Sequence, residues 1–465
     1  MFPRYFSGTV KSDAKTLSPP NWNNRTLFNM IWPLMVEQIL AVTMGAVDTA
    51  MVSSVGEYAI SGVNIVDNIN NLLIIAFSAL CTGGAVVISQ YIGRQDAENA
   101  RLASRQLVYS VTGVSIVIMA VTVMVRRPLI SLIYGNIEDT VMGASSTYLM
   151  ITAFSYPMLA LYNSCAALFR SVGNSNVTMR TALLVNILNI GGNVLFIFGL
   201  KLGVAGAALS TLISRSAAAA VLLSMLITNK RTPVSLAGIL KIKTAPHMVR
   251  NILNVGIPSG LESSMFQIGR LLTQRIFTTF GTAAIAGNAI ASVVNSFSFM
   301  PGNAYGMVLL TVVGQCVGAG NYAAAKRNTV KIIKLAYITI FVMNLFIYLF
   351  MEPLIRIFRL SGEAHDFAKL FLRVHCISMA LGWALSFGLP NALRAAGDAR
   401  YVMIVASASM WTVRVSAAYL LSYVFGVGPL SVWLAMGGDF IVRGTCYLIR
   451  WFGGKWEHQR VIDSC

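Results

Sequence analysis

The chain has 465 residues, of which 56% are hydrophobic and only 11% are charged, and its formal net charge at pH 7 is +18. A soluble domain usually has about 25% charged residues, so this composition excludes a soluble globular protein. The positive charge therefore has to be explained within a membrane protein.

Residues 1–26 are polar and lack the apolar core and cleavage site of a secretory signal, which predicts an uncleaved cytoplasmic tail. Apolar segments of about 20 residues follow, each long enough to cross a bilayer as a helix. They lack the period-two alternation of barrel strands. The pattern predicts an all-α polytopic membrane protein with twelve transmembrane helices at 27–54, 65–93, 104–125, 145–169, 178–199, 204–228, 254–280, 290–318, 332–351, 367–393, 401–425 and 429–449.

The two halves of the chain are copies of each other. A shift of 225 residues, without gaps, pairs Glu37 with Glu262, Gly56 with Gly281, Asn70 with Asn295, Gln90 with Gln315, and Gly93 with Gly318. The second half then lacks one residue, and a shift of 224 pairs Arg170 with Arg394 and Gly173 with Gly397. We therefore predict an N-lobe (27–228), a cytoplasmic linker (229–250), a C-lobe (251–450) and a cytoplasmic tail (451–465). Six spans per repeat make the repeats parallel, with a substrate site between them near the midplane. This geometry favours alternating access over a fixed pore.

The basic residues are distributed unevenly between the two sides of the predicted bundle. With the amino terminus inside, most of them fall in cytoplasmic loops, among them Arg94, Arg170, Lys230, Lys326 and Arg394, and few lie on the other side. This is the positive-inside pattern of membrane proteins. Because it accounts for the net charge, we expect the bilayer as a partner and no nucleic acid.

An ionisable side chain at the centre of a membrane helix costs about 2.5–3.5 kcal/mol on insertion scales, so each one is a candidate for function. Asp48 lies mid-span in the first helix, without a basic residue within two turns. On the fifth span Asn186, Asn189 and Asn193 recur at helical spacing. Such a cluster can hold a proton or a small cation; hydrogen bonding between helices is the structural alternative.

Three further acids have either a coupling or a structural role. Glu37 and Glu262 stand four residues after a proline in the two repeats, where each can accept hydrogen bonds from freed backbone groups. Their equivalence favours the structural role, because ion coupling needs only one of them. Asp67 lies near the outer end of the second span.

The second repeat instead has arginines within its spans. Arg443 follows Asp439 by four residues on one helical face, which predicts a structural ion pair. Arg270 and Arg414 either line the substrate cleft and meet anionic substrates, or neutralise Glu262. The further candidates for the substrate cleft are the uncharged Gln90 and Gln267.

The sequence contains no recognisable catalytic or metal site. Its four histidines are scattered, and the glycine-rich segment 314–320 lacks the Lys-Ser/Thr ending of a phosphate-binding loop. We expect no enzymatic activity and no metal or other cofactor, so that any active transport draws on an ion gradient.

Several short segments occur in a specific order: VDTAMVSSVGEYAISG, SQYIGRQDAENAR and LFRSVGNSN, followed by FGTAAIAGNAIA, GQCVGAGNYAAAKR and ALRAAGDAR. In this order, and duplicated, they make the chain resemble the multidrug and toxic compound extrusion (MATE) family over nearly its whole length. The resemblance implies a V-shaped pair of six-helix lobes. It also implies export of drug-like, often cationic compounds in exchange for H⁺ or Na⁺.

The resemblance also implies site residues. The family's first-lobe cation site matches Asp48, Asn189 and Asn193, and a threonine of its sixth span matches Thr211. The family often has an acid where this chain has Asn193, and the missing charge favours H⁺ over Na⁺. The sodium-coupled branch has a second-lobe acid about one turn deeper than Glu262, at the depth of Gln267 here.

We therefore expect a monomeric antiporter in a bacterial-type inner membrane, with both termini cytoplasmic, that exports cationic organic compounds and uses Asp48 as its coupling carboxylate. A flippase or exporter of lipid-linked or anionic precursors is the alternative, suggested by Arg270, Arg275 and Arg414; it gains weight if these arginines line the cleft and loses weight if each is paired. A passive channel would fit the bundle but not the duplicated clefts with carboxylates.

Overall fold

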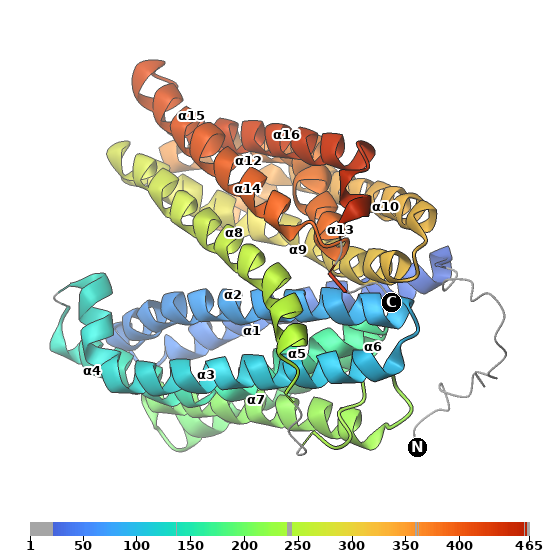
Figure 1. Cartoon of the computed structure of the whole chain (residues 1–465). Helices are drawn as coiled ribbons and strands as arrows, with labels where there is room; N and C mark the ends of the chain where they lie inside the picture. Colours follow the sequence, from blue (N-terminus) through green and yellow to red (C-terminus); the bar gives the residue numbers. More distant parts are fainter. Residues whose placement is uncertain are drawn as a thin grey trace.

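The computed structural model describes residues 22–135, 137–239, 244–358, 360, 362–459 and 461–462 (Figure 1). Most of the predicted amino-terminal tail and part of the predicted linker and carboxy-terminal tail lie outside the described residues. Within the described part the chain is helical, without a strand.

The first repeat contains the six predicted spans. They are α1 (Asn24–Val52), α2 (Glu57–Gly93), α3 (Ala97–Tyr134), the pair α4 (Asp139–Phe154) and α5 (Tyr156–Ser171), α6 (Ser175–Asn193) continued by the π-helical η1 (Val194–Gly199), and α7 (Gly203–Thr228). The fourth span is broken at Ser155, whose hydroxyl donates to the carbonyl of Thr152 (2.6 Å), and Pro157 lies in the first turn after the break.

The second repeat has the same order of spans. The first three spans are α8 (Pro246–Thr279), α9 (Thr282–Gly318), and α10 (Tyr322–Leu349) with the short α11 (Met351–Arg356). The fourth span consists of α12 (Gly362–Trp383), η2 (Ala384–Gly388) and α13 (Leu389–Ala395), and the fifth of α14 (Ala399–Ser409), η3 (Met410–Val415), α15 (Ser416–Tyr419) and η4 (Leu420–Val424). The sixth consists of η5 (Gly428–Leu430) and α16 (Ser431–Phe452) and is followed by η6 (Lys455–His458). Ten helices of the described residues are apolar and long enough to span a membrane. The broken α4–α5 pair and the more polar α8 complete the twelve.

Five helices, α2, α3, α8, α9 and α10, begin seven to ten residues before the predicted boundaries. The predicted third span starts at residue 104, but α3 begins at Ala97 because the Asp96 carboxylate accepts a hydrogen bond from the backbone N–H of Asn99 (3.0 Å) and caps the helix. Similarly, α8 begins at Pro246, inside the predicted linker, with proline in the first turn, where its missing N–H costs nothing.

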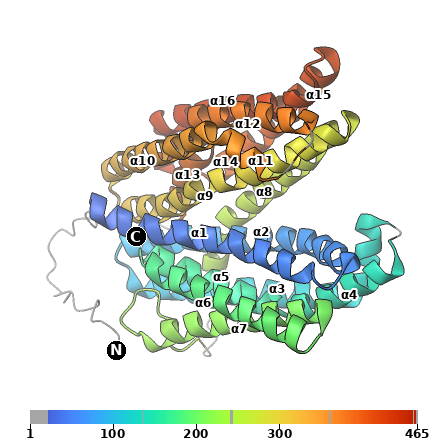
Figure 2. The ribbon, with the colours of Figure 1, turned by 180° about the vertical axis from the view of Figure 1, so that it is seen from behind.

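The two repeats form the two arms of a V. In Figures 1 and 2 the blue to green helices of the first repeat and the yellow to red helices of the second form separate groups. The groups meet at the end where α1 begins and α16 ends, and they spread apart toward α4 and α15. We call these the closed end and the open end.

Equivalent glycines make equivalent turns in the two repeats. Gly56 (φ 139°) and Gly281 (φ 89°) precede α2 and α9, and Gly173 (φ 78°) and Gly397 (φ 101°) follow α5 and α13. Residues with a side chain rarely adopt these positive φ values, whereas glycine adopts them without steric cost. The duplicated glycines of the sequence are therefore required by the backbone.

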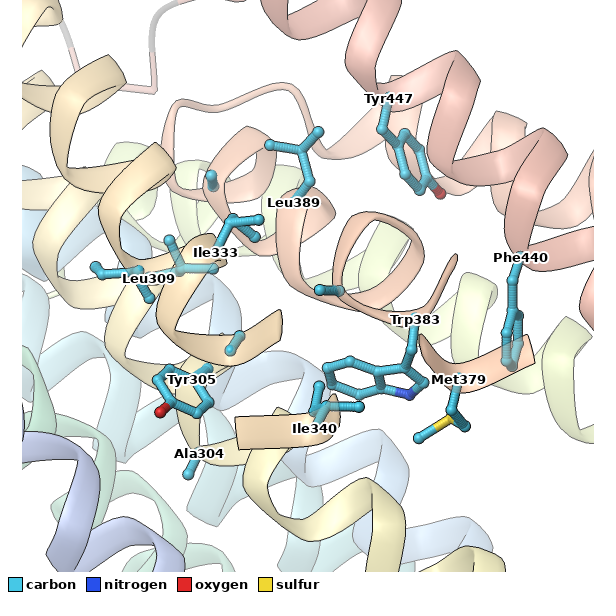
Figure 3. Close-up of a cluster of buried hydrophobic side chains, with 14 of the residues drawn as sticks. Ala304, Tyr305, Leu309, Ile333, Ile340, Met379, Trp383, Leu389, Phe440 and Tyr447 are labelled. Carbon is cyan, nitrogen blue, oxygen red and sulfur yellow. The ribbon is translucent and has the colours of Figure 1, made fainter. Parts of the chain in front are cut away.

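The interior of the C-lobe is a packed apolar cluster (Figure 3). Trp383 is fully buried there, and Met379, Ile340 and Phe440 lie around it in Figure 3. Its indole covers Gly302 of α9 so closely that a Cβ on this glycine would lie 1.7 Å from the ring atom Cη2. The outer faces of the helices are also apolar, and Met124 of α3 is 82% exposed. Such outward apolar surface is expected where lipid replaces water.

Two equivalent hydrogen bonds join the repeats at the closed end. The side-chain amide of Gln90 donates to the backbone carbonyl of Ala395 (2.8 Å), and that of Gln315 donates to the carbonyl of Ser171 (2.7 Å). Gln90 and Gln315 are equivalent by the duplication, and so are Ser171 and Ala395. The contact thus follows the twofold relation of the repeats.

Two glycines allow the backbones to meet at this contact. A Cβ on Gly93 would lie 2.0 Å from the carbonyl oxygen of Gln315, and a Cβ on Gly318 would lie 2.0 Å from that of Gln90. No side chain fits in either space. The closed end is therefore a direct backbone contact between the ends of α2 and α9.

Candidate functional site

The N-lobe encloses a cavity of about 600 Å³. Its walls come from α1, α2, α4, α5, α6 and α7, with Met307 of α9 contributed by the other repeat. Its charged lining residues are Glu37, Asp48, Asp67, Arg170 and Arg215, and its amide and hydroxyl lining groups include Asn70, Asn186 and Thr211. Asp67 and Asn186 thus lie on the same cavity as Asp48.

Asp48 is linked to the amides of α6. The side-chain amide of Asn193 donates to Asp48 Oδ1 (2.5 Å) and lies 3.4 Å from Asn189 Oδ1. The amide of Asn189 is in turn 3.5 Å from Thr211 Oγ1. The four residues that the family resemblance implied are therefore neighbours, with Asp48 and Thr211 on the cavity and Asn189 and Asn193 fully buried behind them.

A close contact between α6 and α7 holds this group together. A Cβ on Gly192 would lie 2.5 Å from Ser210 Oγ and 3.1 Å from Ser210 Cβ, so glycine at this position gives α7 room to approach. The Ser210 hydroxyl donates to the backbone carbonyl of Asn189 (2.6 Å), which places the adjacent Thr211 beside the amide. Immediately after Asn193 the helix widens into the π-helical η1, and such turns often accompany functional sites.

Arg215 is a member of this site that the sequence reasoning missed. It lies on α7, donates to Ser155 Oγ at the break between α4 and α5 (2.8 Å), and interacts electrostatically with both Asp48 and Asp67. It lies within the predicted sixth span, so the cost of a charge in lipid was the signal that could have found it. Among the described residues, neither aspartate has a lysine or arginine nitrogen within 4.0 Å.

Glu37 and Glu262 are each paired with an arginine in the same way. Arg170 Nη2 contacts Glu37, whose other carboxylate oxygen accepts from the Thr178 hydroxyl (2.7 Å). In the second repeat Arg394 Nη2 lies 2.6 Å from Glu262. Of the two alternatives for Arg270 and Arg414, neutralisation of Glu262 is wrong, and the partners of the two glutamates are the equivalent arginines that the sequence assigned to loops. This pairing favours the structural role for both glutamates.

The C-lobe contains a buried cluster around Asp439. The carboxylate accepts from the Ser409 hydroxyl (2.6 Å) and lies 3.3 Å from Arg443 Nη2, as the i, i+4 spacing predicts. Arg414 Nη1 is 4.0 Å from the same carboxylate, and its guanidinium lies over the ring of Phe266 (5.1 Å).

The remaining cleft candidates lie in different places. Gln90 is buried in the inter-repeat contact, so its placement in a substrate cleft is wrong. Gln267 is partly exposed on α8 and lies outside the linings of the cavities described here. Arg270 and Arg414 both line a cavity within the C-lobe, whereas the exposed Arg275 does not.

Comparisons with known proteins agree with this architecture. The MatE family model matches residues 33–195 and 258–420, once in each repeat. An uncharacterized transporter of Bacillus subtilis, YisQ, is 28% identical over 95% of this chain and 97% of its own length. A probable multidrug resistance protein of Thermotoga maritima, NorM, is 28% identical over 94% of both chains. The solved structure of a MATE transporter variant of Vibrio cholerae superimposes with a TM-score of 0.84 at 19% identity, covering 94% of this chain and 98% of the other. The chain belongs to the MatE family of integral membrane multidrug and toxic compound extrusion transporters.

Proposed function

We propose that this chain is a secondary antiporter that exports cationic, drug-like organic compounds in exchange for H⁺, with Asp48 as the coupling carboxylate. The observation that carries the proposal is the position of Asp48, on the wall of the N-lobe cavity and within 2.5 Å of a buried amide. The proposal includes a bacterial inner membrane, cytoplasmic termini and a monomer.

Asn193 suits either protonation state of Asp48. A carboxylate between helices loses much of its hydration, so its charged form depends on hydrogen bonds from the protein. The amide of Asn193 supplies an N–H to this form, and after rotation by half a turn it presents its oxygen to a protonated carboxyl. In the present orientation Asn193 Oδ1 has no hydrogen-bond partner among the described residues, so the rotation breaks no existing bond of that oxygen.

Proton uptake and substrate release are linked through charge. Asp48, Asp67 and Arg215 all line the cavity, and Glu37 and Arg170 neutralise each other, so the lining has one net negative charge. A cation fits this balance, and about 600 Å³ lies within the usual range for small-molecule sites. Protonation of Asp48 removes the net charge and weakens binding of the cation.

Sodium is the second candidate for the coupling ion. Asp48, Asn189, Asn193 and Thr211 supply one carboxylate together with amide and hydroxyl oxygens, which are suitable ligands for a hard cation. H⁺ is favoured because position 193 carries an amide, which leaves only one acid within hydrogen-bond distance of the group.

The test is transport by purified protein in vesicles. An imposed pH gradient should drive accumulation of a cationic dye by the wild type, and Asp48→Asn should abolish it. Asp139→Asn is the matched control, because Asp139 is exposed at the start of α4 and lies outside the cavity. Gradient-driven transport by Asp48→Asn at the wild-type rate would refute the assignment.

A further inference from the structure

A second cavity, of about 330 Å³, lies within the C-lobe. It is formed by the second half of α8, the first half of α9, η3 and the start of α16. Its polar lining residues are Arg270, Thr273, Gln274, Asn288, Ser292, Asn295, Ser296 and Arg414, and its apolar wall includes Phe277 and Trp433. Among the described residues, neither Asp nor Glu lines it.

This cavity is the repeat equivalent of the N-lobe cavity. At the offset of 225, Asp48 corresponds to Thr273 and Asp67 to Ser292, so both acids are replaced by hydroxyl residues. Gly45, on the wall of the N-lobe cavity, corresponds to Arg270. The same framework therefore surrounds two cavities of opposite charge.

Arg414 has hydrogen-bonding capacity that the protein does not use. The residue is only 6% exposed, and within the described part of the chain its Nε and Nη1 atoms have no hydrogen-bond partner. Asp439 is the nearest acid, but its Oδ2 is 4.0 Å from Arg414 Nη1 and closer to Arg443 Nη2, at 3.3 Å. These two nitrogens are covered by the surrounding protein, so what Arg414 brings to the cavity that it lines is a positive charge that no close ion pair neutralises.

The second arginine is also available. Arg270 is exposed on the cavity wall, and among the described residues no carboxylate oxygen lies within 4.0 Å of it. Arg414 and Arg443 share the carboxylate of Asp439, and Arg270 adds a third guanidinium group to this region. The region has a net positive charge, which is the opposite of what an organic cation requires.

We propose that this C-lobe cavity binds the carboxylate or sulfonate group of an aromatic organic anion. Arg414 and Arg270 bind the acidic group, for which the planar guanidinium is well suited because it offers paired N–H donors to two oxygens. The amides of Gln274 and Asn288 donate further hydrogen bonds, and Phe277 and Trp433 contact the aromatic body. The inference goes beyond the coupling role of Asp48 and does not depend on it.

Calorimetric titration of the detergent-solubilised protein tests this binding without any ion gradient. The probe is naphthalene-2-sulfonate, with neutral naphthalen-2-ylmethanol and inorganic phosphate as comparisons. Arg270→Gln should weaken binding of the sulfonate about tenfold, as expected for loss of one charge-assisted hydrogen bond. Since no acid of the described residues pairs with Arg270, this variant should fold normally. Arg275→Gln is the matched control on the same helix, because Arg275 is exposed and lies off the cavity lining.

The outcomes separate the proposal from its alternatives. It is supported if the sulfonate binds at least tenfold more tightly than both the neutral alcohol and phosphate, and if only Arg270→Gln reduces this affinity. Equal affinity for the alcohol, or equal loss in the two variants, would overturn the assignment of an anion site. Equal affinity for phosphate would overturn the contribution of the aromatic wall. Because Asp48→Asn should leave this binding unchanged, the test is independent of the coupling hypothesis.

Discussion

Gly93→Ala should weaken the closed end and shift the protein away from the V-shaped conformation. The new Cβ would lie 2.0 Å from the carbonyl oxygen of Gln315, whereas real Cβ atoms essentially never approach other atoms within 3.0 Å. The ends of α2 and α9 must therefore separate by about 1 Å, because the Cβ is fixed to one helix backbone and the carbonyl belongs to the other, so neither can rotate away. That separation strains the hydrogen bonds from Gln90 to Ala395 and from Gln315 to Ser171.

The magnitude follows from those two hydrogen bonds. At about 1 kcal/mol each, their loss removes about 2 kcal/mol from the closed contact, which changes the ratio of conformers about 30-fold. Gly113→Ala is the control, because the same change on α3 meets nothing within 4 Å. The control should resemble the wild type.

Electron paramagnetic resonance distances across the open end measure the shift. Spin labels at Ser54 and Thr279, which lie in or next to the equivalent turns of the two repeats, report the separation of the arms. Gly93→Ala should add a population with a shorter distance. An unchanged distribution in a folded Gly93→Ala protein would refute the view that the backbone contact maintains the V.

Three further substitutions test other parts of the account. Glu262→Gln should lower the free energy of unfolding in detergent by about 3–5 kcal/mol, because it leaves the partly buried Arg394 without its carboxylate partner. In thermal unfolding experiments the double variant Glu262→Met/Arg394→Met should recover the lost stability, and an equal loss in the double variant would contradict the pairing. Gly302→Ala should destabilise by about 1–3 kcal/mol through overpacking against Trp383; the loss should shrink in a Trp383→Leu background, and additive losses in unfolding experiments would count against this contact. Asn193→Asp places a second acid next to Asp48, and two neighbouring carboxylates repel each other unless a proton or cation lies between them. Sodium should therefore raise the melting temperature of this variant but not that of the wild type. An equal rise in both proteins would contradict H⁺ coupling.

Much of the architecture could be predicted because lipid imposes simple rules. Long apolar segments have to be helices, and the duplication predicted both the parallel repeats and the equivalent glycine turns at Gly56 and Gly281. Helical spacing placed the asparagines of the fifth span near one another, and the family resemblance implied their grouping with Asp48. The break at Ser155 lies two residues before Pro157, whose missing N–H and ring are compatible with a new helix start but not with a helix interior.

The contacts between helices could not be predicted in the same way. In a membrane bundle both the lipid-facing and the packed surfaces are apolar, so composition does not tell them apart: on α3, Leu107 is fully buried and Met124 is 82% exposed. The pairing of Arg170 with Glu37, across 133 residues, depends on which faces meet. For the same reason Gln90 was expected in a cleft and lies in the inter-repeat contact. Arg215, by contrast, was visible in the sequence as a charge within a span.

Proton movement driven by substrate is the most direct test of the coupling proposal. Vesicles containing the protein and a pH-sensitive dye, prepared without any imposed gradient, are given a gradient of a cationic substrate. The account predicts that the wild type moves protons against the substrate flow and that Asp48→Asn does not. Substrate-driven proton flux of wild-type size in Asp48→Asn, with the protein folded, would contradict the central claim.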